Sequence, residues 1–338
     1  MRGVPHWLMA AAAVATIAVT TGGAAHAALT LTAAGIADGF SLSLFADTPG
    51  PSSGCCGPLG IATNNLGQVV LQYYPTGRNY VFNDVDGQHL PGTALSSAPF
   101  VSSSYGVAIT NDGGTLYAGN NDQSGQVFQL NPDGSSAGAV PNTTGKAGHG
   151  IATNPVTGHL EAASGNGIFD INPANGASFL IKAVNADGVS VSADGKTVYA
   201  AIGGDVFGFD IGTGNQVYDS GNIGSPDGTG VIQGSNQFAG DIISNDNDGT
   251  VKLLDPVHNT VATIASGGTR GDYVGLDLTN GSLFLTQSDS VYRLTCGPNC
   301  SFTPPPPPPP GVPEPATLTL IGTGLVAFGL IRRRRGNV

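Results

Sequence analysis

The chain has 338 residues, with 12 basic against 23 acidic side chains and a net charge of −11. Arg2 and the four arginines at the other end contribute five of the basic residues, so the part between them is more acidic still and repels phosphate backbones. Nucleic acid is therefore excluded as an expected partner. Abundant Gly, few charged residues and many Asn, Ser, Thr and Asp suit a turn-rich exported β protein.

Residues 1–27 have the order of a secretory signal peptide. Arg2 precedes the apolar run LMAAAAVATIAV, and Ala25-His26-Ala27 ends the segment with a small-x-small cleavage pattern. An N-terminal core helix is the alternative, which this order disfavours. We therefore expect export of the chain, with cleavage after Ala27.

Six related segments recur through residues 28–300. Each segment reads as a short apolar strand, an Asn/Asp-Gly turn and a second strand, and a third strand and another turn follow. The segments are GIATNNLGQVV from Gly60, GVAITNDGGTLYA from Gly106, GIATNPVTGHLEA from Gly150, GVSVSADGKTVYA from Gly188, GTGVIQGSNQFAG from Gly228 and VGLDLTNGSLFLT from Val274. A period of about 43 residues is typical of propeller blades, so we predict an all-β, six-bladed β-propeller.

The sixth unit ends after its third strand, because Cys300 leads directly into a proline-rich stretch. An alternating segment, GFSLSLFAD from Gly39 to Asp47, is left over at the N-terminus. Pairing of this segment with the last unit would close the ring and remove an exposed strand edge.

Four cysteines lie at the two ends of the predicted ring: Cys55 and Cys56 enter the first unit, and Cys296 and Cys300 leave the sixth. An even number of cysteines in an exported chain favours disulfides. Pairing across the ring closure and local pairing, Cys55 to Cys56 and Cys296 to Cys300, are both open. A redox or metal-binding role is a third interpretation, although neither CC nor CGPNC has the CxxC spacing.

The residues just before the innermost strands form a candidate ligand site, because equivalent positions of different blades converge on one mouth of the central channel. These residues are Leu59, Tyr105, His149, Asp187, Asp227 and, in the sixth unit, Asp272 or Tyr273. Clustered carboxylates with an imidazole suit a divalent cation such as Ca²⁺ or a polar ligand. The alternative is that Asp-Gly only turns the chain into a strand.

The repeats also resemble the regucalcin and gluconolactonase-like six-bladed propellers and the related NHL-type repeats. In the metal-dependent members of that family, an Asn or Asp immediately before a Gly at these strand starts ligates the metal. NADGV at Asp187 and SPDGT at Asp227 match in kind and in blade order. The resemblance therefore implies a metal site and lactonase chemistry. The family's first-blade Glu has no counterpart, and Cys56 stands near its place.

The segment SNDNDGTVKLLD is a second calcium candidate. Asp246, Asp248 and Asp255 stand at the third, fifth and twelfth positions of a DxDxDG-type loop that begins at Ser244. The same residues also fit an ordinary hairpin between two blade strands, in register with the other units.

Residues 301–311 form a proline-rich spacer, and residues 312–338 form a tail. The seven consecutive prolines of the spacer predict an extended polyproline II rod. In the tail, the 16 uncharged residues 316–331 predict a short membrane-spanning helix. The arginines that follow favour the cytoplasmic side: Arg332, Arg333, Arg334 and Arg335.

The tail resembles the PEP-CTERM sorting tail of exported bacterial proteins, which is also catalogued as the C-terminal domain of some ice-binding proteins. The triplet Pro313-Glu314-Pro315, the apolar helix and the arginine cluster all match. The resemblance implies cleavage by an exosortase near the triplet, with the helix as a transient anchor in the inner membrane of a Gram-negative bacterium. A permanent single-pass anchor is the alternative.

Three functions are consistent with these features. The favoured function is a non-catalytic propeller that is displayed or released at the cell surface and binds a polysaccharide, a surface protein or a small polar ligand. One alternative is a metal-dependent, lactonase-like hydrolase that uses His149, Asp187 and Asp227. The other is a structural matrix scaffold.

Overall fold

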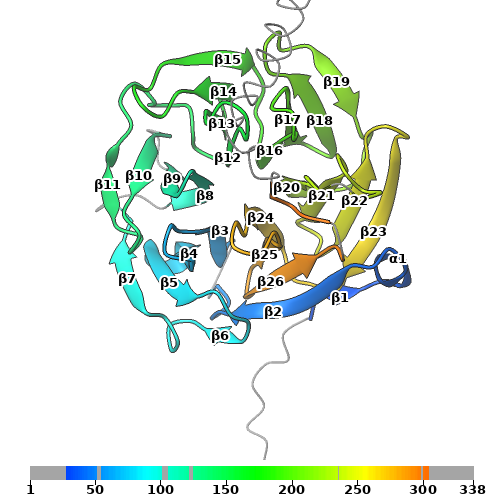
Figure 1. The fold of residues 1–338 in the computed structure, drawn as a ribbon, viewed down its shortest axis with the longest axis horizontal. Coiled ribbons are helices and arrows are strands. Elements are labelled where there is room, and N and C mark those ends of the chain that lie inside the picture. The colour runs from blue at the N-terminus through cyan, green and yellow to red at the C-terminus, as the bar shows by residue number, and fades with distance from the viewer. Residues whose placement is uncertain are drawn as a thin grey trace, which may run out of the picture.

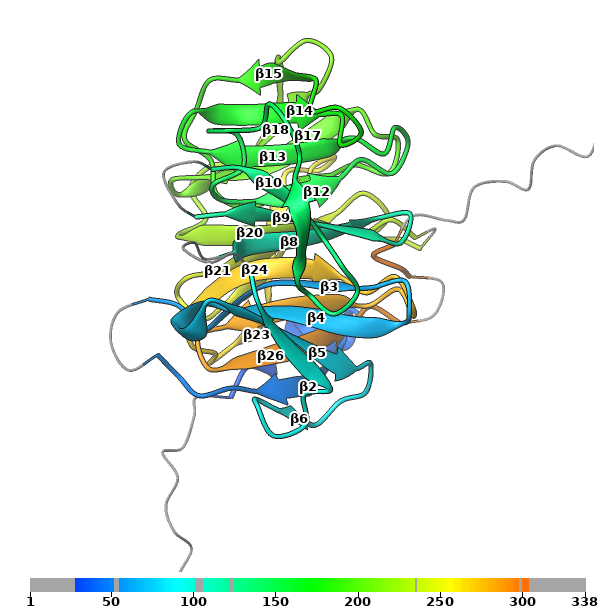
Figure 2. The ribbon, with the colours of Figure 1, turned by 90° about the vertical axis from the view of Figure 1, so that its left-hand side faces the viewer.

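The alternation of short apolar strands with Gly-containing turns folds into a ring of six antiparallel sheets, as predicted (Figure 1). The structure is a computed structural model and describes residues 28–51, 55–100, 106–121, 125–234, 236–297 and 300–303. In the side view, strands such as β4 and β13 run from one face of the ring towards the other (Figure 2).

The first four blades follow one another along the chain, and each has four strands whose innermost strand comes first. Blade 1 consists of β3 (Pro58–Thr63), β4 (Gln68–Tyr73), β5 (Arg78–Asn83) and β7 (Ser96–Pro99), with the short 3-10 helix η1 (Tyr74–Thr76) after β4. Blade 2 consists of β8 (Gly106–Asp112), β9 (Thr115–Asn120), β10 (Val127–Leu130) and β11 (Ser136–Ala139). Blade 3 consists of β12 (Ile151–Thr153), β13 (Leu160–Ser164), β14 (Gly167–Ile171) and β15 (Ser178–Lys182). Blade 4 consists of β16 (Val189–Val191), β17 (Thr197–Ile202), β18 (Asp205–Asp210) and β19 (Gln216–Asp219).

Blades 5 and 6 each receive strands from the N-terminal segment. Blade 5 consists of β20 (Pro226–Val231), β21 (Ile242–Asp246), β22 (Val251–Asp255) and β23 (Thr260–Ser266), and β1 (Thr30–Leu31) pairs with the outer side of β23. The five-residue helix α1 (Ala33–Ala37) follows β1. Blade 6 consists of β24 (Gly271–Leu276), β25 (Leu283–Gln287) and β26 (Ser290–Thr295), then β2 (Ser41–Asp47) and the two-residue β6 (Gln88–His89).

The N-terminal strand closes the ring, as expected from the leftover segment Gly39–Asp47. Strand β2 pairs antiparallel with β26, from Ser41 opposite Thr295 to Asp47 opposite Ser290. Its Phe45 is fully buried, with ring centroids 4.9 Å from Phe284 in blade 6 and 6.3 Å from Phe82 in blade 1. The strand therefore joins the first and last blades through packing as well as hydrogen bonds.

The two disulfides of the structure are local. Cys55 is joined to Cys56, and Cys296 is joined to Cys300. Of the two pairings left open by the sequence, this one leaves ring closure to strand pairing and side-chain packing.

The packed body extends slightly past the boundary expected after Cys300. Phe302 is fully buried in the core cluster that also contains Leu29, and the backbone of Gln233 donates to the carbonyl of Ser301 over 2.7 Å. The predicted signal peptide, the remaining spacer and the sorting tail, with Pro313, Glu314, Pro315 and Arg332 to Arg335, lie outside the described residues. Within the described part of the chain, no helix has both the length and the apolar character needed to cross a membrane.

Candidate functional site

The mouth pocket is a cavity of about 230 Å³ at one end of the ring axis, where the innermost strands begin. Of the residues predicted to meet there, the structure places these along its wall: Leu59, His149, Asp187, Asp227, Asp272 and Tyr273. Tyr105 lies outside the described residues. The hydroxyl of buried Tyr273 donates a hydrogen bond to the carbonyl of Ile151, which ties the start of blade 6 to that of blade 3 across the axis.

The Gly after each Asp has a packing role of its own. A Cβ atom at Gly188 would lie 2.2 Å from the carbonyl oxygen of Asp227, and one at Gly228 would lie 2.8 Å from that of Asp272. These distances are shorter than a carbon atom tolerates, so only Gly lets neighbouring blades approach at the axis. The Asp-Gly pattern is thus partly structural, while the Asp side chains line the pocket.

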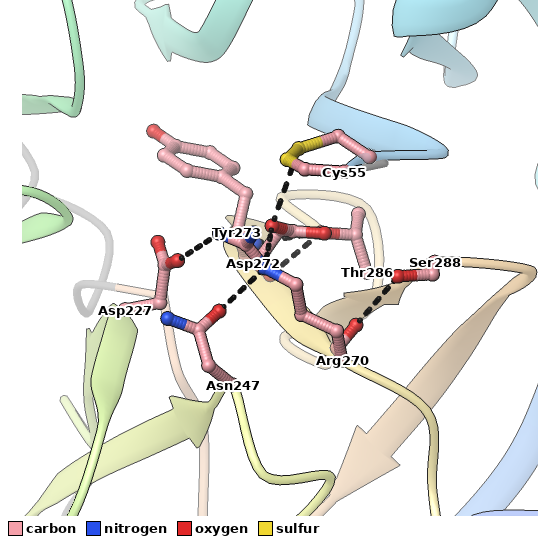
Figure 3. Close-up of a disulfide and its surroundings, with 9 residues drawn as sticks. Cys55, Asp227, Asn247, Arg270, Asp272, Tyr273, Thr286 and Ser288 are labelled. Carbon is pink, nitrogen blue, oxygen red and sulfur yellow. Dashed lines mark hydrogen bonds and ion pairs between the residues drawn. A yellow bond between two sulfur atoms is a disulfide. The ribbon is translucent and has the colours of Figure 1, made fainter. Parts of the chain in front are cut away.

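Arg270 is a charged residue of the pocket that the sequence analysis did not predict. Its Nε lies 2.9 Å from Oδ1 of Asp272 and donates to Oδ1 of Asn247 over 2.7 Å, and its Nη2 donates to Oδ2 of Asp227 over 3.2 Å (Figure 3). The signal available in the sequence was a rare basic residue two positions before Asp272. Arg270 precedes the sixth repeated segment, which begins at Val274.

The pocket carboxyl groups resist ionisation. Asp227 and Asp272 are only 7% and 3% exposed. Burial raises the pKa of Asp272 to about 6, with Arg270 acting in the opposite direction. Burial also raises the pKa of Asp227 well above its usual value, and repulsion from Asp187 and Asp272 adds to this effect. Oδ2 of Asp272 is buried without a hydrogen-bond partner among the described residues.

His149 and Asp187 complete the polar wall. Nδ1 of His149 lies 2.7 Å from the carbonyl oxygen of Ala186 and must donate to it, because a carbonyl only accepts. In the neutral ring, Nε2 is then an acceptor. Solvent reaches Asp187, but partial desolvation by the surrounding pocket wall raises its pKa, and His149 and Arg270 oppose this rise. The pocket therefore offers many acceptors and one guanidinium as its strong donor.

The Cys55–Cys56 disulfide lines the mouth pocket beside Asp272. Sγ of Cys56 lies 3.8 Å from Oδ1 of Asp272 (Figure 3). Among the described residues, the group of three metal-binding side chains with ligand atoms within 4.8 Å of one another is Cys55, Cys56 and Asp272. Asp187, Asp227 and Asp272 do not form such a group.

The residues of the mouth therefore do not fit a divalent cation. Calcium binds six to eight oxygens at about 2.3–2.6 Å, which requires carboxylates closer together than these. The sulfur atoms of Cys55 and Cys56 are bonded to each other in the disulfide. Arg270 forms ion pairs with Asp227 and Asp272.

The second calcium candidate forms the hairpin between β21 and β22, the ordinary interpretation of its sequence. Each of its carboxylates has protein partners: Asp246 pairs with Lys252, Asp248 accepts from the hydroxyl and backbone of Thr250, and Asp255 lies 2.5 Å from Nδ1 of His258. Gly249, with φ of 77°, makes the turn that an L-residue would strain.

Comparison with known proteins adds information on the tail and on the fold. Residues 311–335 match the model of the PEP-CTERM protein-sorting motif. The chain carries a PEP-CTERM sorting motif. This motif implies export across the membrane and processing by an exosortase. No significant match was found among curated proteins.

Solved structures similar to this chain are also propellers. A gluconolactonase from Xanthomonas campestris is 14% identical with a TM-score of 0.58, and the match covers 82% of this chain and 99% of that one. A putative gluconolactonase is 14% identical with a TM-score of 0.57, over 79% of this chain and 97% of that one. The WD40 β-propeller domain of Doa1 is 13% identical with a TM-score of 0.53, and the match covers 72% of this chain and 79% of that one. These likenesses establish the fold alone.

Proposed function

We propose that this PEP-CTERM protein is an exported, non-catalytic binding propeller whose mouth pocket holds one neutral or positively charged sugar residue. Display or release at the cell surface after exosortase processing is part of the proposal. The observation that carries it is the convergence of Asp187, Asp227, Asp272 and His149 on one pocket that contains a single cationic side chain, Arg270.

The chemistry of the wall supports a hydroxyl-rich ligand. Carboxylate oxygens and Nε2 of His149 accept hydrogen bonds, so they match the hydroxyl or ammonium donors of a sugar or amino sugar. An anionic ligand such as a uronic acid would add to the repulsion that already raises the pKa of Asp227, whereas an ammonium donor would stabilise the ionised carboxylates.

Size and apolar surface support the same class. A cavity of about 230 Å³ is below the roughly 300–1,000 Å³ typical of sites for drug-sized ligands, which limits the ligand to about one sugar residue. Leu59, Tyr74 and the Cys55–Cys56 disulfide line the pocket beside the charged groups. They provide an apolar face for the C–H side of a sugar ring.

Calorimetric titration of the purified body with glucosamine, glucose and glucuronate tests this function. We expect glucosamine to bind most tightly and glucuronate most weakly. Asp187 is a solvent-exposed residue of the pocket wall. Asp187→Asn should weaken glucosamine binding by about tenfold or more, or roughly 1.4 kcal/mol. Asp219→Asn, on the exposed outer strand of the same blade, is the matched control. Tightest binding of glucuronate, or no binding of any of the three sugars, would contradict the proposal.

A metal-dependent hydrolase is the second candidate, favoured by the gluconolactonase-like fold and by the positions of Asp187 and Asp227. The paired charge of Arg270 argues against it. We expect thermal melting of the wild-type body to be the same in calcium and in chelator. A bound ion at a hundredfold excess over its dissociation constant would add about 2.7 kcal/mol. A calcium-dependent rise of several degrees that Asp227→Asn abolishes would favour the hydrolase instead.

A further inference from the structure

A second pocket of about 210 Å³ adjoins the mouth pocket. Asn185, Ala201, Gly203, Ser225 and Asn247 are among its lining residues, and they come from blades 4 and 5 and the segments leading into them. His149 and Asp187 line both pockets, so these two side chains form the wall between them.

The shared wall is held in place by hydrogen bonds. The ring of His149 is anchored by the carbonyl of Ala186, and the backbone N–H of Asp187 donates to the carbonyl of Ala201 over 2.9 Å. The Asp187 side chain is open to solvent, so a ligand can pass over it from one pocket to the other.

Asn247 links the two pockets chemically. Its side-chain Oδ1 accepts from Arg270 in the mouth (Figure 3). Its backbone N–H donates to the carbonyl of Ser225 in the second pocket. The second pocket adds neutral polar groups, the amide of Asn185 and the hydroxyl of Ser225, to the shared carboxylate and imidazole. Its chemistry is again that of a partner for hydroxyl groups.

We propose that the two pockets are adjacent subsites for a linear glycan of at least two sugar residues. The glycan crosses the wall formed by His149 and Asp187. This inference rests on the proposed function, because the mouth pocket holds one of the two residues. It adds the second subsite and a chain-like ligand, such as an exopolysaccharide, rather than a free monosaccharide.

Titration with glucosamine and with its β-1,4-linked disaccharide tests the second subsite. We expect the wild-type body to bind the disaccharide about tenfold or more tightly than the monosaccharide. Ser225→Phe fills the second pocket from a half-buried position and should remove this advantage while leaving glucosamine binding unchanged. Ser96→Phe, on the exposed outer strand of blade 1, is the matched control and should keep the advantage.

Asn185→Ala provides a milder variant at an exposed position, where loss of folding is not expected. It should weaken binding of the disaccharide and leave that of glucosamine unchanged. Equal affinity of the wild type for both sugars, or an advantage that survives in Ser225→Phe, would overturn the second subsite while the mouth pocket stands. Failure of both sugars to bind would overturn the mouth pocket as well.

Discussion

The buried residue Glu161 makes the stability of the molecule depend on pH. Apart from Glu314 in the tail it is the chain's only glutamate, and it is 0% exposed on β13. Asn154 donates to its Oε1 over 3.1 Å, whereas its Oε2 has no partner among the described residues. Burial raises its pKa to about 8, and the nearby Asp170 acts in the same direction.

This pKa predicts a pH-dependent free energy of unfolding. The folded state holds the proton more tightly than the unfolded state, so Glu161 supports stability at low pH. That contribution is lost as the pH rises from about 4.5 to about 8, at about 1.4 kcal/mol for each unit of pKa difference. Glu161→Gln should therefore gain stability relative to the wild type over this range, as measured by urea unfolding at pH 5, 7 and 9. The same change in the free energy of unfolding with pH for the wild type and Glu161→Gln would contradict the prediction.

Arg270 and the mouth aspartates show what can be predicted for single residues. The register of the repeats brought His149, Asp187, Asp227 and Asp272 to one pocket, because equivalent strand starts converge on the axis. The repeat contained no cue for the ion pairs of Arg270 with Asp227 and Asp272. These pairs depend on the direction in which one long side chain crosses the mouth.

Strand β2 is the element on which ring closure depends. Arg293 on β26 lies opposite Ser43 of β2. It pairs with Asp84 at 2.5 Å and Asp86 at 2.8 Å, which follow β5 of blade 1, and also with buried Asp277. Its guanidinium carbon lies 5.3 Å from the ring centroid of Phe45. Charge pairing and aromatic packing thus reinforce the same joint between the first and last blades.

The closing strand should be sensitive to truncation of its buried side chain. Phe45→Ala removes a fully buried ring between Phe82 and Phe284 and should lower the free energy of unfolding by about 3–5 kcal/mol. Leu44→Ala, at the neighbouring position that is 41% exposed, is the control and should cost much less. Urea unfolding of both variants measures the difference. Equal effects would show that β2 does not close the ring by packing.

At the scale of the whole molecule, the two ends of the described chain meet. Leu29 near the start and Phe302 near the end belong to one core cluster, together with residues of blades 5 and 6. The predicted proline rod and the sorting motif therefore follow, along the chain, a segment that packs against blades 5 and 6.

The sorting motif predicts a maturation defect in the native host. Substitution of Glu314 by Ala, or deletion of residues 332–335, should leave an unprocessed, membrane-held precursor, because the triplet and the basic cluster direct recognition and retention. Immunoblots of membrane and released fractions measure this. A substitution in the spacer, Pro307→Ala, is the control. Unchanged release of both tail variants would show that the tail is not a processing signal.

The sequence by itself determined the number of blades, the closing strand, the candidate mouth residues and the sorting motif. These features follow from the period of the repeats, their register and the order of residues in the terminal segments, all of which are local properties of the sequence. Only the tertiary structure decided the local cysteine pairing, the hairpin form of the SNDNDG segment and the pairing of Arg270 with Asp227, which lies 43 residues away. Those outcomes depend on distances and side-chain directions between neighbouring blades, and no repeat pattern carries that information.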